Sequence, residues 1–236
     1  MQKDCVLLVS LVAAASLSAP AYAITPKYRL PLEPVQAVTG KPLTVISYGK
    51  PADFVAKSYS AEQGTDKPLS SGPMAGLALT QLWIADGNRL VRMNGVVDPG
   101  PQIASRVAPV IAAKLKAPAT RMLPNQNPDT DSPAELAALV KKKGAILDVE
   151  TIRWGFEYFE SDPKHFSVVY SARARITDAR TGKYVAFVHC DHESDSNPKT
   201  APTWDQLTAG KAALVKQKLA AAAASCVKTL AAELPG

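Results

Sequence analysis

AILDVETIRWGFEYF (residues 145–159), FSVVYSARARITD (166–178) and KYVAFVHC (183–190) decide the fold, because each is rich in the β-branched and aromatic residues that strands prefer. Residues 160–165 and 179–182 separate these runs, and both connections are short. Short connections of this kind join strands that pair antiparallel. The three runs therefore predict an antiparallel meander that ends near Cys190.

After the meander, the sequence predicts a long closing helix. Thr203 and Gln206 form a capping-box pattern at its start. Four residues share one helical face at spacings of four, three and four: Leu219, Ala223, Cys226 and Leu230. An alanine run at residues 220–224 allows this helix to approach a sheet closely.

Weaker signals outline the elements before the meander. In chain order we expect a strand at residues 42–49, a polar loop at 60–73, a buried helix at 74–85, an amphipathic helix at 103–117 and a short strand at 120–123. Gly87 should break the chain after the first helix, and Pro109 should kink the second. Ser132 and Glu135 form a capping-box pattern for a further helix that ends at Gly144.

This order of elements predicts an α+β fold. We expect a mostly antiparallel sheet with a C-terminal three-strand meander, helices packed on it and a long C-terminal helix that closes the fold. Gly155, inside the first long strand, is expected to mark a bulge. Residues 43–236 should form a single domain, preceded by an extended, proline-rich lead-in at residues 24–42.

Residues 1–23 are interpreted as a signal peptide that is cleaved after Ala23. Residues 6–19 are apolar, and Ala21-Tyr22-Ala23 is the small-x-small pattern of a cleavage site. A membrane anchor is the alternative, but the apolar run is shorter than the roughly 20 residues that span a bilayer, and Pro20 interrupts it. We therefore expect the mature chain in the periplasm, without a transmembrane segment.

The chain carries 27 lysine and arginine residues against 21 aspartate and glutamate residues, a net charge of +6. The basic residues are dispersed, except for residues 141–143 at the end of a predicted helix, where the helix dipole favours cations. We interpret this cluster as a solvated helix end and expect no nucleic acid partner. The excess charge is compatible with attraction to anionic surfaces of the envelope.

Two cysteines remain after cleavage, Cys190 and Cys226. An even number in an oxidising compartment predicts a disulfide. Cys190 ends the third strand and Cys226 lies on the apolar face of the closing helix, so the bond would join the sheet to that helix. Two separate buried thiols are the alternative.

All three histidines are predicted near one end of the meander. His165 precedes the second strand, and His189 and His192 end the third, which runs antiparallel to it. A metal- or small-ligand-binding site here, with Asp191 and Glu193, is therefore an alternative function. Strand alternation places His189 and His192 on opposite faces, however, and the spacing of a structural zinc site is absent. The main interpretation includes no metal and no cofactor.

Three aromatic residues, Trp154, Phe156 and Tyr158, alternate along one face of the first long strand. They form part of the core or, alternatively, an aromatic surface for a partner protein. Arg173 and Arg175 share one face of the second strand and either face solvent or reach acidic groups of the segment DGNRLVRMNG. Together these five residues are a possible partner surface.

The motifs of several enzyme classes are absent from the sequence. It contains no GxSxG elbow, no Walker motif and no dinucleotide-binding glycine pattern. Ser161 and Lys164 match an SxxK motif by letters only, because that chemistry needs the serine at a helix start. We therefore predict that the protein is not an enzyme.

Residues 132–232 resemble a family of bacterial envelope domains. The resemblance rests on the step AELAALVKKKGAILDVETIRW and on the hairpin ARITDARTGKYVAF, which contains Asp178, Thr181 and Gly182. The family includes the curli-secretion lipoprotein, the N-terminal domain of the Tol-system translocation protein and lipoproteins that activate penicillin-binding proteins. The mature chain is also similar to a group of uncharacterised exported proteobacterial proteins, through DGNRLVRMNGVVDP, WGFEYF and the two cysteines.

The resemblance implies a non-catalytic accessory or scaffold protein that acts through protein–protein binding in the cell envelope. An envelope protein is therefore the expected partner. The lipidated cysteine of the lipoprotein members has no counterpart here, since Cys5 precedes the apolar run of the predicted signal peptide.

Overall fold

The computed structural model describes residues 32–58, 73–127 and 132–236. The predicted signal peptide, the first part of the lead-in and nearly all of the predicted polar loop lie outside these residues. The short 3-10 helix η1 (Val35–Ala37) lies in the described part of the lead-in.

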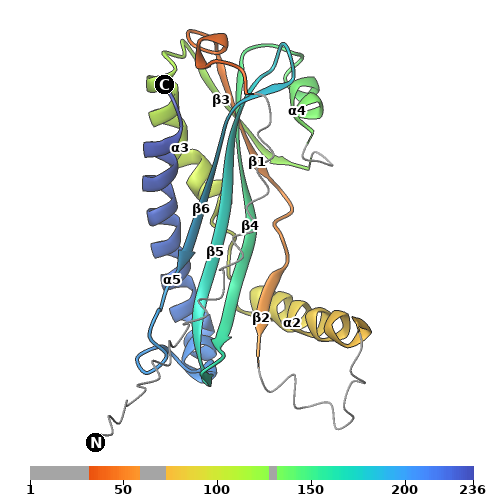
Figure 1. Ribbon diagram of the computed structural model, residues 1–236, viewed down its shortest axis with the longest axis vertical. Helices are drawn as coiled ribbons and strands as arrows, with labels where there is room; N and C mark the ends of the chain where they lie inside the picture. The colour runs from red at the N-terminus through yellow and green to blue at the C-terminus, as the bar shows by residue number, and fades with distance from the viewer. Residues whose placement is uncertain (1–31, 59–72, 128–131) are drawn as a thin grey trace, which may run out of the picture.

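The predicted meander is confirmed. It consists of β4 (Ala145–Phe159), β5 (Asp162–Asp178) and β6 (Lys183–Glu193), which pair antiparallel in sequence order. β5 begins before the predicted Phe166, and β6 continues past the predicted Cys190. With its 17 residues, β5 extends over about 55 Å, so the meander sets the long dimension of the molecule (Figure 1).

Three shorter strands complete a sheet of six. They are β1 (Leu43–Tyr48), β2 (Phe54–Lys57) and β3 (Thr120–Gln126). β1 and β2 both pair parallel to β4, β1 at residues 145–149 and β2 at residues 154–157. β3 pairs parallel to β1 at the edge, so the path across the sheet is β3-β1-β4-β5-β6.

Two helices cover one face of the sheet, and a shorter helix covers one end of the other face. α3 (Gly100–Lys114) and α5 (Trp204–Glu233) lie along the same face and contact each other (Figure 1). α4 (Pro133–Leu139) packs on the opposite face near the start of β4. α2 (Pro73–Asn94) contacts β2 near the far end of β4 and extends away from the sheet. The expected fold class, with its long closing helix, is confirmed.

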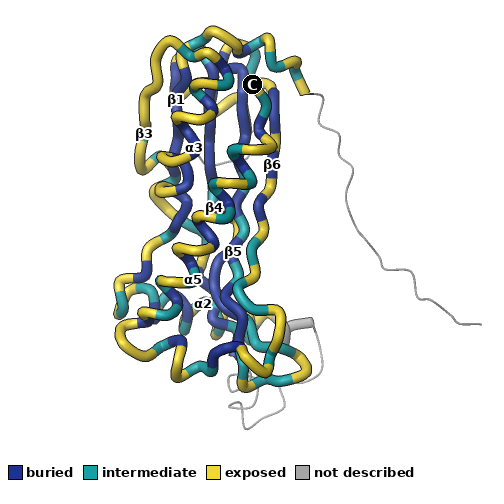
Figure 2. The backbone as a smooth tube through the Cα atoms, turned by 90° about the vertical axis from the view of Figure 1, so that its left-hand side faces the viewer, coloured by how far each residue is buried: buried dark blue, intermediate teal, exposed yellow. Residues whose placement is uncertain are grey.

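The hydrophobic core lies between the sheet and the α3–α5 layer, and β4 and β5 are buried along most of their length (Figure 2). The predicted apolar face of α5 is confirmed, since Leu219, Ala223, Cys226 and Leu230 are all buried. A second, small cluster lies beneath α4 on the opposite face, where Leu136 packs with its neighbours. Among the described residues, α3 and α5 therefore cover one face of the sheet, and α4 covers only the end of the other.

The start of α5 also agrees with prediction, because Thr203 and Gln206 form both bonds of the capping box. The capping box predicted at Ser132 is wrong, since the Ser132 side chain makes no capping hydrogen bond. That helix also ends at Leu139 instead of running to Gly144, because Lys141 and Lys142 adopt positive φ angles that lie outside the right-handed helical region.

Gly87 does not end α2, which continues to Asn94. The bulge predicted at Gly155 lies instead at Ile152, where the β4–β5 register shifts. Both glycines instead allow their backbones to lie close to the backbone of β2. A Cβ atom on Gly87 would lie 2.0 Å from the carbonyl oxygen of Phe54, and one on Gly155 would lie 1.9 Å from that of Val55.

The disulfide between Cys190 and Cys226 is present, with the two Cα atoms 5.4 Å apart. It connects the end of β6 to the buried face of α5, as the sequence predicts. The bond closes a loop with a sequence separation of 36 residues.

We expect Gly155→Ala to destabilise the protein by about 3 kcal/mol or more, because the added methyl group clashes with the β2 backbone. Gly95→Ala is the matched control: Gly95 also has a positive φ, but its Cβ would meet nothing within 4 Å. That variant should lose about 1 kcal/mol, the cost of the backbone angle alone. Urea unfolding measures both, and equal losses would contradict the steric role of Gly155.

Loss of the disulfide should lower the free energy of unfolding by about 3–4 kcal/mol, because the cross-link restricts the unfolded chain. The measurement is denaturant unfolding of the wild type with and without reductant. A variant that combines Cys190→Ser with Cys226→Ser provides the control, since its stability should not respond to reductant. A wild type that is equally insensitive would show that the bond does not form in the protein.

Candidate functional site

The face of the meander opposite α3 and α5 is lined by polar side chains. We call it the polar face, and its residues are Asp148, Glu150, Arg153 and Glu157 of β4, Ser167, Ser171, Arg173 and Arg175 of β5, and His189, Asp191 and Glu193 of β6. They occupy this face because the strand residues between them point into the main core. The polar face is therefore the first place to look for a site.

At the α4 end of the polar face, Arg175 and Asp148 form a buried ion pair. Their side chains are 1% and 0% exposed, and Arg175 Nε donates to Asp148 Oδ1 over 2.8 Å. Tyr48 of β1 accepts from Arg175 Nη2 over 2.9 Å and donates to Asp148 Oδ1 over 3.0 Å. The Tyr184 ring of β6 lies 5.7 Å from the guanidinium carbon. The cluster thus connects β1, β4, β5 and β6.

Burial determines the protonation of this cluster. It raises the pKa of Asp148, and the neighbouring Arg175 opposes that shift. Burial also raises the pKa of Tyr48, and the Asp148 carboxylate adds to the shift, so Tyr48 keeps its proton. Burial alone would lower the pKa of Arg175, but the charge of Asp148 raises it overall. Arg175, Tyr48 and Asp148 Oδ1 are hydrogen-bonded to one another, which is the arrangement of a structural pair, whereas Asp148 Oδ2 is buried without a hydrogen-bond partner among the described residues.

A second, half-buried carboxyl group, Asp98, lies on the core face at the start of α3. It accepts hydrogen bonds from the Gly100 amide over 3.0 Å and from the Thr151 hydroxyl over 2.5 Å. Thr151 also contacts the Tyr170 hydroxyl at 2.8 Å. Burial raises the pKa of Asp98. Its bonds hold the first turn of α3 against β4 and β5, which is a structural task.

Further along the polar face, each large cation is paired with a neighbour. Arg173 Nη2 lies 2.5 Å from Glu150 Oε2, and Arg153 Nη2 lies 2.5 Å from Glu157 Oε1. Arg173 and Arg175 therefore pair across to β4, and neither is directed at the segment DGNRLVRMNG. Arg175 therefore does neither of the two things predicted for it, because it is buried and neither faces solvent nor reaches that segment.

A hollow of about 390 Å³ lies at the end of the polar face that is distant from α4. Its lining is mainly polar: Arg153, Glu157, Tyr158, Phe159, Ser167, Val169, Ser171, Asp191, His192 and Glu193. Two of its charges are neutralised by the Arg153–Glu157 pair, and Ser171 donates to Asp191. Among the described residues, no group of three or more His, Cys, Asp or Glu side chains is placed to hold a metal ion.

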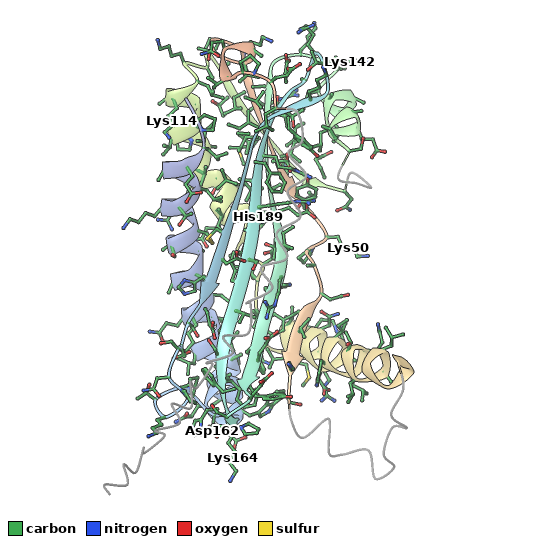
Figure 3. The ribbon with its side chains drawn as sticks, in the orientation of Figure 1. Lys50, Lys114, Lys142, Asp162, Lys164 and His189 are labelled. Carbon is green, nitrogen blue, oxygen red and sulfur yellow. A yellow bond between two sulfur atoms is a disulfide. The ribbon has the colours of Figure 1, made fainter. Side chains whose placement is uncertain are left out.

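The three histidines do not converge. His189 pairs with Arg173, eight residues along β5 from His165, which corresponds to about 26 Å. His192 pairs with Tyr170, five residues from His165, or about 17 Å. The Nδ1 atom of His165 instead lies 2.7 Å from Asp162 Oδ2. Asp162 lies near the lower end in Figure 3, whereas His189 lies at mid-height. The sequence-based prediction brought the histidines together because it assumed that β6 reaches the connection between β4 and β5, where it placed His165.

Trp154 and Phe156 belong to the core, the first of the two predicted alternatives, and so are not available as a partner surface. Their side chains are buried and form edge-to-face contacts with Phe54 at ring-centroid distances of 5.0 and 5.9 Å. Phe156 also contacts Trp204, the first residue of α5, at 5.1 Å. Tyr158 is only half-buried, with Lys57 Nζ 5.0 Å from its ring. This aromatic cluster holds β2 and the start of α5 on the meander.

The predicted burial of the apolar helix at residues 74–85 is wrong. We call residues 77–86 of α2 the α2 arm, and none of them is buried. Leu77 is 62% exposed and Leu82 is 43% exposed. Trp83 is half-buried, and its indole nitrogen donates to the Ser58 carbonyl over 3.2 Å. Leu90, one turn after Gly87, is buried, so α2 reaches the core only with its second half.

The sequence contained a signal for the ion pairs, but not for the α2 arm. Residues 148 and 150 are acidic and residues 173 and 175 are basic, each pair two residues apart on strands of one predicted hairpin. Opposite charges in that pattern indicate cross-strand pairs. An apolar run, by contrast, has the same appearance whether a core or a partner covers it, so exposure of Leu82 required the structure.

No protein-family model and no curated protein matches the chain. Among solved structures, the PelC dodecamer from Paraburkholderia phytofirmans is 12% identical, with a TM-score of 0.32 over 86% of this chain and 91% of that chain. A DUF330 protein from Xanthomonas campestris is 12% identical, with a TM-score of 0.34 over 86% and 92%. The lipoprotein GNA1162 from Neisseria meningitidis is 16% identical, with a TM-score of 0.22 over 67% and 88%. Neither a family nor a function follows from likeness at these scores.

Replacement of one member of the buried ion pair should be more costly than replacement of both. We expect Asp148→Leu or Arg175→Met alone to lower stability by about 3–5 kcal/mol, because each leaves an uncompensated buried charge. The double variant should lose less than the sum of the two single losses. Arg153→Gln, in a more exposed pair, is the control and should cost about 1 kcal/mol or less. Strictly additive losses in urea unfolding would contradict a coupled pair.

Proposed function

We propose that the protein is a non-catalytic accessory or scaffold of the bacterial periplasm that acts by binding another envelope protein. The observation that carries this proposal is the α2 arm, an apolar helical segment in which no described side chain is fully buried and in which Leu77 and Leu82 are exposed. No helix among the described residues is long and apolar enough to cross a bilayer. A partner protein would provide the apolar cover that the arm lacks.

The composition of the arm suits a helix that lies in a groove of a partner. Its first nine residues, 77–85, contain no charged side chain. Four large apolar residues and one tryptophan fall in that stretch: Leu77, Leu79, Leu82, Trp83 and Ile84. A rigid helix presents such residues with little loss of conformational entropy, and tryptophan is frequent among the residues that dominate binding energy. Large exposed apolar groups on a monomer commonly mark interaction sites.

The polar face supports the non-catalytic part of the proposal. Its basic residues Arg153, Arg173 and Arg175 are each engaged with a carboxylate. The buried Asp148 and the half-buried Asp98 hold structural elements together. The alternative function, a ligand site built from the three histidines, finds no support in a geometry that separates His165 and His189 by about 26 Å.

The experiment is site-specific photo-crosslinking in intact cells, with a photoreactive amino acid in place of Leu82. We expect one envelope protein to dominate the crosslinked products. Leu77→Asp, combined with the photoreactive residue, should reduce the yield at least about tenfold, because a charge in the buried centre of an interface is unfavourable.

The matched control is Val110→Asp, another exposed apolar residue changed to aspartate, on the outer side of α3. It should leave the crosslinking yield unchanged. An absence of crosslinked products from position 82, or an equal loss in both aspartate variants, would contradict the proposal.

A further inference from the structure

We propose that the end of the sheet nearest α4 is a docking site for a membrane surface that contains anionic phospholipids. This inference goes beyond protein binding and uses a different part of the molecule. It rests on the charge of four connections that meet at that end and on an apolar groove beside them. We call this region the basic end.

The pairing register defines the basic end. Thr120, Leu43, Ala145, Asp178 and Lys183 are paired in succession from β3 to β6, so they form one row across the sheet. The connections that reach this row are residues 38–42, 115–119, 140–144 and 179–182. They are distant in sequence, but the register brings them together.

All four connections are basic, and none contains an acidic residue. Their cations are Lys41, Lys116, Lys141, Lys142, Lys143 and Arg180. Arg121 and Lys183 lie beside them, in or next to the row. No ion pair with another described residue is formed by Lys116, Arg121, Lys183 or residues 141–143. The cluster at residues 141–143, which the sequence suggested was only a solvated helix end, is therefore part of a larger charged region.

Carboxylates also lie at this end, since Glu135 is in the first turn of α4 and Glu233 ends α5 beside Lys114, but the six cations of the connections outnumber them. Asp178 is fully buried and lies 3.4 Å from Lys41 and 3.8 Å from Arg180. Glu33 accepts a hydrogen bond from Thr181 over 3.0 Å. The opposite end of the meander carries charges of both signs, since Asp162 and Lys164, two residues apart in the sequence, lie there. Lys114 and Lys142 lie at the upper end in Figure 3. The basic charge is therefore concentrated at one end of an elongated molecule.

An apolar groove is lined in part by Arg121, Lys141 and Lys143, three cations that form no ion pair with another described residue. Its volume is about 420 Å³, and its lining is Pro42, Leu43, Thr44, Ala119, Thr120, Arg121, Leu139, Val140, Lys141 and Lys143. Leu139 is 41% exposed at the end of α4. Apolar residues bordered by lysine and arginine are the combination that binds an amphiphile with an anionic headgroup. A purely ionic partner, such as an acidic peptide, would not need the exposed Leu139.

The basic end and the α2 arm point to different partners. β2, which carries the α2 contacts, pairs with β4 from Trp154 onward, nine residues or about 30 Å from the row at Ala145. A molecule that stands with its basic end on a membrane would thus hold the arm well above the lipid surface. The two proposals can fail independently, because each depends on its own set of residues.

The test is co-sedimentation of the protein with phosphatidylcholine vesicles that contain or lack phosphatidylglycerol. We expect binding only to the anionic vesicles, and we expect it to weaken with rising salt. The test variant carries Lys141→Asn, Lys142→Asn and Lys143→Asn, since asparagine tolerates the positive φ angles of the first two positions. Its apparent affinity should fall by roughly a hundredfold, at about fivefold per lysine.

The control variant carries Lys164→Asn, Lys199→Asn and Lys211→Asn, three exposed lysines outside the basic end. It loses the same net charge and should bind like the wild type. A further variant, Leu139→Asn, changes no charge and should weaken binding through the groove alone. Equal losses in the two lysine variants would overturn the proposal. Polyglutamate serves as a soluble anionic probe, and binding to it without binding to the vesicles would also overturn the proposal. So would binding to neither.

Discussion

The pairing of β4 with β5 is the interaction on which the rest of the structure depends. It runs from the Ala145–Asp178 pair to the Phe159–Asp162 pair, with a shift at Ile152. This register places Arg175 beside Asp148 and Arg173 beside Glu150, and it directs Trp154 and Phe156 to the side that α5 covers. A slip of one residue would bury the charges beneath the helices and expose the aromatic rings.

The hairpin turn and the side-chain pattern thus reinforce each other. The buried Arg175–Asp148 pair is stable only in one register, since each charge needs its partner in the low-dielectric interior. The same register aligns the ends of five strands in one row and thereby assembles the basic end from four separate connections. Local pairing in the meander therefore determines features that lie far from each other in sequence.

Much of the fold could be predicted because its strongest signals are local. Strand composition identified β4, β5 and β6, and the capping box at Thr203 identified the start of α5. The Cys190–Cys226 disulfide followed from compartment and pattern. Features that depend on what lies against a segment were not predictable. Gly87 and Gly155 appeared to be a break and a bulge, whereas both serve the approach of β2.

The candidate surfaces show the same limit in a functional setting. Arg175 and Trp154 are conspicuous in the sequence, but the structure uses both for stability. Leu82 and Lys142 appeared to have ordinary structural roles, and both belong to surfaces that the fold leaves open. We therefore interpret the molecule as an elongated spacer whose polar face carries ion pairs, with an apolar arm that we propose binds a protein and a basic end that we propose binds a membrane.

Hydrogen–deuterium exchange in the presence of isolated bacterial envelope membranes tests this division most directly. The account predicts slower exchange in residues 77–86 and in residues 115–119 and 140–144, and unchanged exchange in β6 at residues 189–193. Protection centred on residues 189–193, with the α2 arm and the basic end unaffected, would show that the polar face is the binding surface and would contradict the account.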